Sequence, residues 1–523
     1  MSRRSRGCLR CRQRRVKCDQ GKPACMRCIT RNELCVGYRD ESDLIFQHET
    51  TKVLARNSVL TQEALLQSAA SPEQVSVTTA SRSRSQSLSR LDAVSTPATS
   101  PETNDSTFSW NRDFVNENTD SADTDDAVSL FFDKYVVPCN ELSSPGFLEH
   151  LPCLFKESNV QGRSALRWAV QACAYADIYS RDTSQVAAKV ALELYSRALS
   201  ELGKSLSIKG KIPDDHDLMT VVILDLFETL FMLDMPSQGS HVQGMANILR
   251  LRGHEQFHDP RGWSLFRLAH HRIQKQQLAK GMRPIQESTT WLETYTGTDS
   301  FSLAEKNALK ISNICREAND LLEQIRDMSL QVQSLVPLIQ RMNALDHEAT
   351  TWREESEWSF QTIDRQSVLG DTGLAALLPQ RLEIHQDLWM AYEWNYHRAA
   401  RITLHHQLIH CIDQATASIA EGTAILELKR QRVASVAIIQ TLSEQVLSTV
   451  PQSFGDVDSS GRMSMVKSVS EAIGGYFLLW PIKIIKGANS AATSAQKDAS
   501  NAVFERIREC TGMKENLGSL SII

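Results

Sequence analysis

Six cysteines near the start of the chain constrain this segment more than any other feature of the sequence. They are spaced C-x2-C-x6-C-x6-C-x2-C-x6-C, and the first three positions recur seventeen residues later. The six are Cys8, Cys11, Cys18, Cys25, Cys28 and Cys35. The repeat divides the segment into two similar halves, each with a C-x2-C turn followed by a third thiol.

Zinc is the partner that we expect for these thiols. A C-x2-C turn places two thiolates on one side of a metal ion, as in structural zinc sites. Two tetrahedral zinc ions need eight ligand positions, and the first histidine of the chain is His48. Six thiolates fill the eight positions if two of them bridge both ions. The repeat nominates Cys8 and Cys25, the first cysteine of each half, as the bridges.

Three other uses of the cysteines remain open at this point. Disulfides need an oxidising compartment, and no apolar signal-peptide segment follows the basic start of the chain. A single zinc ion would leave two cysteines spare. Zinc storage would account for the cysteines but not for the arginines between them.

Charge is unevenly distributed along the chain. Residues 1–40 hold twelve Lys/Arg against three Asp/Glu, a balance of +9, whereas the whole chain has a formal net charge of −5. The other residues therefore carry −14. A basic head on an acidic body predicts a polyanionic partner for the head.

The cysteine segment also has the run RQRRVKCD after its second cysteine and Pro23 in its middle loop. With these features it resembles the fungal binuclear zinc cluster DNA-binding domain. The resemblance covers the cysteine segment alone. It implies two short helix-loop halves around two bridged zinc ions, joined at that proline, and DNA binding in the major groove.

The first half of the cluster is the more basic, so we expect it to face DNA. The forked guanidinium of arginine matches the O6 and N7 acceptors of guanine. By the resemblance, Arg15 and then Arg14 are the expected base readers of a CGG-type triplet. Arg10, Arg12 and Lys17 are expected to contact phosphates and fix the register of the protein on the duplex.

Residues 41–126 carry weaker signals. One heptad frame within residues 41–67 runs Phe46, Thr50, Val53, Asn57, Leu60 and Ala64. This frame is consistent with a short helix or weak coiled coil, and it leaves homodimerisation open. Residues 68–126 are rich in Ser and Thr and then acidic, which predicts a disordered linker. The acidic end, with Phe108, Trp110 and Phe114, fits either a solvated linker or an activation segment.

Residues 127–523 read as one helix after another, so the fold class that we expect for the chain is all-α. The expected architecture is a two-zinc cluster in residues 1–40, the linker, and a large helical domain of packed helix pairs. Within residues 184–206, one apolar stripe contains Val186, Val190, Leu194, Ala198 and Leu202. The apolar range 217–235 holds three acidic residues and is expected to be a buried helix rather than a membrane span.

Short patterns within residues 127–523 mark the start of the apolar helix expected at 217–235 and link the helical region to a known domain. Asp214 and Asp215 stand just before it, as residues at a helix start do. Residues 127–136, 151–155, 241–253 and 477–482 resemble segments of the fungus-specific transcription factor domain. That resemblance implies a regulatory role, often over metabolic or secondary-metabolite genes.

Signals for catalysis are weak. His406 and His410 stand four residues apart beside Cys411, but the glutamate of an H-E-x-x-H zinc site is missing. Residues 388–396 concentrate Trp and Tyr, which fits a packed helix core or the wall of an effector pocket. We therefore expect a protein that is not an enzyme.

The sequence predicts a nuclear, zinc-dependent, sequence-specific regulator of genes transcribed by RNA polymerase II. Its expected partners are double-stranded DNA and transcription cofactors, with no membrane partner and with a small-molecule effector unsupported. One alternative is a helical scaffold or corepressor with non-specific nucleic-acid contact. Another is an enzyme or effector receptor on the helical domain, with the cluster as an address.

Overall fold

The structure is a computed structural model that describes most of the helical region and part of the cysteine segment. The described residues are Cys11, 16–19, 25–31, 121–139, 146–159, 163–232, 240–294, 300–328, 330–350, 358–418, 423–464, 471–513 and Leu517. The heptad frame expected at residues 41–67 and most of the expected linker lie outside these ranges.

Helices make up nearly all of the regular structure in the described ranges, so the expected all-α class is confirmed. In the cysteine segment the structure describes the short helix α2 (Met26–Ile29). The first long helix, α4 (Ser121–Tyr135), begins within the range expected to be linker.

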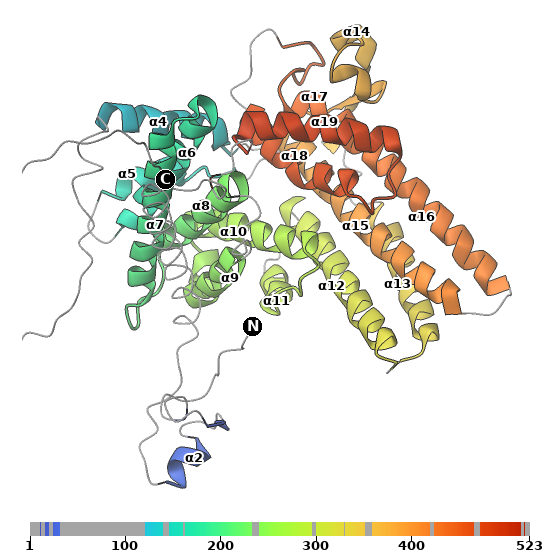
Figure 1. Cartoon of the computed structure of the whole chain (residues 1–523), viewed down its shortest axis with the longest axis horizontal. Helices are drawn as coiled ribbons and strands as arrows, with labels where there is room; N and C mark the ends of the chain where they lie inside the picture. The colour runs from blue at the N-terminus through green and yellow to red at the C-terminus, as the bar shows by residue number, and fades with distance from the viewer. Residues whose placement is uncertain are drawn as a thin grey trace, which may run out of the picture.

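A first group of helices packs together from α4 to α9 (Figure 1). Helices α6 and α7 form an antiparallel pair across a tight connection at Thr183 and Ser184, and Ser184 Oγ accepts a hydrogen bond from the N–H of Ala187. The bounds in this group are α5 (Leu151–Glu157), α6 (Ser164–Asp182), α7 (Gln185–Leu206), α8 (Asp215–Phe231), α9 (Ser240–Arg252) and the 3₁₀ turn η1 (His254–Phe257).

Helix α8 is the buried helix that its apolar sequence predicted. Asp214 caps its start, with Asp214 Oδ1 accepting from the N–H of Asp217 at 3.0 Å and Asp217 Oδ2 accepting from the N–H of Asp214 at 3.1 Å. This reciprocal capping box satisfies donors that have no partner within the helix. Nearly every residue of α8 is buried, including the acidic Asp225 and Glu228.

The apolar stripe expected on α7 is right for its second half and wrong at its start. Leu194, Ala198 and Leu202 are buried, but Val186 is 61% exposed. A strict four-residue step advances about 40° beyond a full turn of a helix with 3.6 residues per turn, so a long row drifts off the buried face. The core face near the start of α7 is instead made by Ala187, Ala188 and Ala191.

Helix α10 (Pro260–Ala279) lies between the first group and a second group that runs from α11 to α19 (Figure 1). It packs against α8 and α9 on one side and against α12 and α15 on the other. The bounds in the second group are α11 (Glu287–Thr294), α12 (Ser300–Arg326), η2 (Val332–Ser334), α13 (Leu335–Ala349), α15 (Leu388–Ser418), α16 (Thr423–Ser448), α17 (Val450–Ser453), α18 (Glu471–Lys486) and α19 (Ser494–Thr511).

One small sheet interrupts the helices within the described residues. Strands β1 (Gln361–Asp364) and β2 (Arg381–Ile384) pair antiparallel, with Gln361 opposite Ile384. Between them lie α14 (Arg365–Leu369) and the turn η4 (Ala375–Leu377). The sequence shows no clear alternation there, because β1 is mostly exposed while β2 is almost wholly buried.

The core of the helical region joins its beginning to its end. The largest apolar cluster combines residues of α4 to α10 with residues of α15 to α19. Tyr135 of α4 belongs to this cluster, and its hydroxyl donates to the carbonyl oxygen of Thr511 on α19 at 3.2 Å. A second cluster is centred on α12, α13 and α15.

One helical stretch, Thr423–Ser453, is long and apolar enough to cross a membrane by length and composition. Half of its most apolar window is buried inside the protein. A core helix of a soluble protein passes the same test, so this stretch is weak evidence for a membrane span.

Candidate zinc and DNA-binding site

Four cysteine side chains of the N-terminal segment come together in a small cluster of their own. Cys11, Cys18, Cys25 and Cys28 are all buried, and Cys25 is fully inaccessible to solvent. The ligand atoms of Cys11, Cys25 and Cys28 all lie within 4.8 Å of one another. All four are free thiols, so the structure gives no support to disulfides between them.

These sulfur positions fit zinc. Cys11 Sγ and Cys25 Sγ are 3.8 Å apart. Two thiolates on one tetrahedral zinc ion, each with a Zn–S bond of about 2.3 Å, are expected to lie about 3.8 Å apart. Bound zinc would hold the thiolates at this distance and replace the apolar core that such a short segment lacks.

Cys25 has the central place among the described cysteines. It belongs to the group with Cys11 and Cys28 and also to a second group with Cys18 and the carboxylate of Asp19. Cys25 directly precedes helix α2, and its carbonyl oxygen accepts from the N–H of Cys28 at 3.0 Å. The C-x2-C turn therefore places Cys25 and Cys28 on the same side of the cluster.

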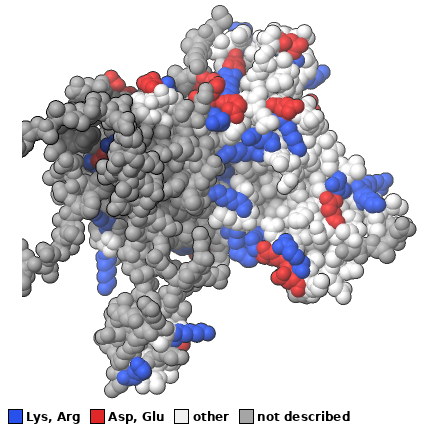
Figure 2. Space-filling view, viewed as in Figure 1, with Lys and Arg blue, Asp and Glu red and all other residues white. Residues whose placement is uncertain are grey.

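The expected DNA-contacting residues are only partly described. Lys17 is exposed, as is Arg31 beyond α2, and Figure 2 shows basic side chains on the surface of this part of the chain. The other expected site residues lie outside the described residues: Cys8, Arg10, Arg12, Arg14, Arg15 and Cys35.

The histidines and cysteine noted on α15 form no joint site. His406 Nε2 accepts from the N–H of Ala491 at 3.3 Å, and burial, helped by His405 and Lys497, lowers the pKa of His406 to about 4. His410 is exposed, whereas Cys411 is fully buried. The two histidines and the cysteine are thus divided between the surface and the protein interior.

The aromatic residues at 388–396 belong mainly to the helical core. Trp389 and Tyr392 lie in the larger apolar cluster and Tyr396 in the smaller one. Tyr392 stacks on Phe477 of α18 with ring centroids 4.2 Å apart. The packed-core interpretation of this segment is therefore confirmed.

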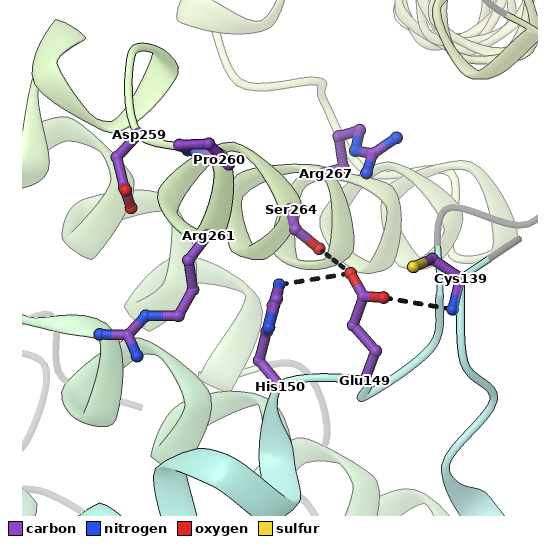
Figure 3. A pocket seen from close by; sticks show the side chains of 8 residues that line it. All are labelled: Cys139, Glu149, His150, Asp259, Pro260, Arg261, Ser264 and Arg267. Carbon is purple, nitrogen blue, oxygen red and sulfur yellow. Dashed lines mark hydrogen bonds and ion pairs between the residues drawn. The ribbon is translucent and has the colours of Figure 1, made fainter. Parts of the chain in front are cut away.

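A cavity of about 580 Å³ lies at the start of α10 (Figure 3). Glu149 points into it: Oε1 accepts from Ser264 Oγ at 2.7 Å and lies 3.3 Å from His150 Nε2, while Oε2 accepts from the N–H of Cys139. The hydrogen bond with Glu149 raises the pKa of the Cys139 thiol, which keeps the thiol protonated. These polar groups pair with one another, and the thiol is not activated as a nucleophile.

Buried polar side chains of α10 form a network that the sequence analysis missed. His270 Nδ1 and His271 Nδ1 contact the two carboxylate oxygens of Glu305 on α12, at 3.0 and 2.6 Å. Burial alone would raise the pKa of Glu305, but His271 and His270 lower it to about 2. Arg272 forms an ion pair with the buried Asp225 of α8.

Lys275 lies beside this network without a carboxylate partner among the described residues. Its Nζ lies 5.4 Å from the ring centre of Tyr392 and 5.0 Å from that of Tyr476. Burial first, and then the charge of Arg272, lower the pKa of Lys275 to about 7, although Asp225 acts in the opposite direction.

Lys275→Met is therefore expected to stabilise the protein more at pH 6 than at pH 9. Below pH 7 the folded protein holds a charged amine in this partly buried place. Between pH 7 and the ordinary lysine pKa the unfolded chain binds more protons than the folded one, so stability rises with pH. Thermal unfolding at several pH values measures the effect, with Lys280→Met at an exposed position as control. A stability difference that does not change with pH would contradict the lowered pKa.

A family profile matches the cysteine segment, and curated proteins match short parts of the chain. Residues 6–44 match the profile described as the fungal Zn(2)-Cys(6) binuclear cluster domain. White-opaque regulator 2 of Candida albicans is 53% identical over 38 residues, which is 7% of this chain and 8% of that protein. Transcriptional regulatory protein moc3 of Schizosaccharomyces pombe is 56% identical over 32 residues, 6% of each chain.

A longer match is found in an uncharacterized transcriptional regulatory protein of Schizosaccharomyces pombe. It is 32% identical over 104 residues, 20% of this chain and 19% of that protein. Each of these three matches thus spans less than a fifth of the relative's length. Among solved structures there is no significant match.

The family profile, the spacing of the six cysteines and the buried sulfurs agree with one another. The profile's own description specifies two zinc ions and six cysteines. Residues 6–44 of this chain are therefore a fungal Zn(2)-Cys(6) binuclear cluster domain, which holds two zinc ions.

Proposed function

We propose that this protein is a sequence-specific DNA-binding regulator of transcription that acts in the nucleus. The observation that carries the proposal is the buried thiol cluster, spaced for zinc, in a strongly basic segment. The curated relatives have names that describe regulators, two of them transcriptional. A scaffold or corepressor with non-specific nucleic-acid contact is the alternative function.

The proposed zinc ligands are the six cysteines of the repeat, with Cys8 and Cys25 bridging both ions. Cys25 supports this assignment because its sulfur lies close to cysteines of both halves, Cys11 and Cys18 on one side and Cys28 on the other. A thiolate that serves both ions must lie between the two halves, and the full burial of Cys25 agrees with that position.

The proposed DNA contacts follow from charge and from the chemistry of base edges. The first half of the cluster carries Arg14 and Arg15, which we assign to the guanines of a CGG-type triplet in the major groove. Arg10, Arg12 and Lys17 are assigned to phosphates. The exposure of Lys17 agrees with a phosphate contact.

Arg15→Ala is expected to relax base choice at one guanine of the site. The loss of one bidentate contact costs about 1–3 kcal/mol at that base pair. Lys17→Ala should instead weaken binding to all sequences. Because one phosphate contact is lost, the slope of log affinity against log salt concentration should become shallower by about one unit. Binding of both variants to matched and mutated duplexes at several salt concentrations separates the two effects. An equal loss on every duplex would remove Arg15 as a base reader.

We propose that the helical region has a regulatory rather than a catalytic role, at genes transcribed by RNA polymerase II. The polar groups of its cavity and of the α10 network pair with one another, as structural groups do. The continuous packing between its first and last helices suits a unit that responds as a whole to cofactors or to a second copy of the chain.

A further inference from the structure

One hydrogen bond links the two halves of the zinc cluster across the middle loop. Asp19, which follows the last cysteine of the first half, accepts through Oδ2 from the N–H of Met26 at 2.9 Å. Met26 is the first residue of α2 and follows Cys25, the first cysteine of the second half. The contact therefore joins the residues that come directly after a cysteine in each half.

The N-cap residue of α2 is a cysteine of the cluster, so its own side chain does not cap the helix. The first N–H groups of a helix have no acceptor within the helix, and a side-chain oxygen at the N-cap usually supplies one. Cys25 occupies that position, makes no side-chain cap hydrogen bond, and has its sulfur buried among the other thiols. Asp19, from the first half of the cluster, supplies a side-chain acceptor for the N–H of Met26 instead.

The carboxylate of Asp19 lies close to cysteine sulfurs, where a hydrogen-bond donor is needed to offset the repulsion between negative charges. Six thiolates outweigh the charge of two zinc ions, and a carboxylate oxygen of Asp19 lies within 4.8 Å of the sulfurs of Cys18 and Cys25. Like charges so close repel one another. The hydrogen bond from the N–H of Met26 favours the ionised carboxylate and offsets this repulsion.

We infer that Asp19 is a positioning residue of the zinc cluster, whose carboxylate caps α2 from the end of the first half and so holds Cys25 and Cys28 on the metal ions. This inference rests on the proposed assignment of the six cysteines to two zinc ions. It does not depend on which DNA sequence the cluster reads.

Two variants of the full-length protein separate capping from metal ligation. Asp19→Ala removes the cap, whereas Asp19→Asn keeps a side-chain oxygen that can accept from Met26. Transfer of zinc to a chromogenic chelator is expected to be about fivefold faster in Asp19→Ala, the scale of losing one N-cap. Asp19→Asn should stay within about twofold of the unchanged protein, because asparagine caps about as well as aspartate.

A second readout uses cobalt, whose absorption spectrum reports the ligands around the metal. If Asp19 acts by position, the cobalt-loaded Asp19→Ala protein has the thiolate spectrum of the unchanged protein. A changed spectrum in both variants would show that Asp19 is itself a ligand and would overturn the inference. Thr30→Ala is the matched control, since it removes a hydrogen bond to the carbonyl oxygen of Met26 but leaves the cap in place.

The outcomes distinguish this inference from the function proposed above. If the unchanged protein binds two zinc ions and Asp19→Ala releases them at the normal rate, the inference on Asp19 fails alone. If the unchanged protein does not bind two zinc ions, the assignment of the six cysteines and the inference on Asp19 both fail.

Discussion

Replacing Cys25 with alanine is expected to remove both zinc ions and to abolish specific DNA binding. A bridging thiolate serves both ions, so its loss leaves each of them with an incomplete ligand set. Small zinc domains fold only with their metal, and the whole cluster should therefore unfold. The buried position of Cys25 between the other described cysteines is the structural basis of this expectation.

Zinc content per chain and DNA binding by the purified full-length protein measure the effect of Cys25→Ala. Cys153→Ala is the matched control, because Cys153 is exposed on α5, far along the chain from the cluster. Retention of one firmly bound zinc ion together with normal DNA binding would show that Cys25 is not a bridge.

The second large effect is expected in the helical region, where Arg272→Met should destabilise the fold by about 3–5 kcal/mol. Arg272 Nε donates to Asp225 Oδ2 at 3.1 Å, and its Nη1 donates to the hydroxyl of Tyr476 at 2.6 Å. Burial would raise the pKa of Asp225, but Arg272 and His241 hold it below its usual range. Without Arg272 the carboxylate of Asp225 stays buried without its cation, and this is the main cost.

Denaturant unfolding of the full-length protein measures this loss, while its zinc content should remain unchanged. A double variant, Arg272→Met with Asp225→Leu, should recover much of the stability, because replacing a whole buried pair by apolar residues is often neutral. Arg341→Met is the surface control: its ion pair with Glu317 is exposed and should contribute at most about 1 kcal/mol. Equal losses for Arg272→Met and Arg341→Met would contradict the buried-pair account.

The zinc segment could be predicted from its sequence because its information is local. Cysteine spacing, basic residues and Pro23 all lie within the family match at residues 6–44. Asp19 was missed although it lies inside the same segment. Its hydrogen bond to Met26 depends on how the two halves fold together, and no spacing rule reports that.

The helical class was also predictable, because apolar periodicity and capping residues act over one or two turns. The start of α8 at Asp215 is an example. The network around Glu305 was not predicted, since it joins α10 to residues distant in sequence. A signal was present in α10, where His270 and Gln277 stand on the same face as Phe266 and Ile273. Polar residues on an otherwise apolar face indicate buried partners, but not which ones.

The most direct test of the central claim is selection of random double-stranded DNA by the full-length protein loaded with zinc, beside a chelator-treated control. The account predicts enrichment of CGG-type triplets only when zinc is present. Their number and spacing would show whether the protein binds as a monomer or a dimer. Salt-sensitive binding without any sequence enrichment would contradict specific reading and favour the scaffold alternative.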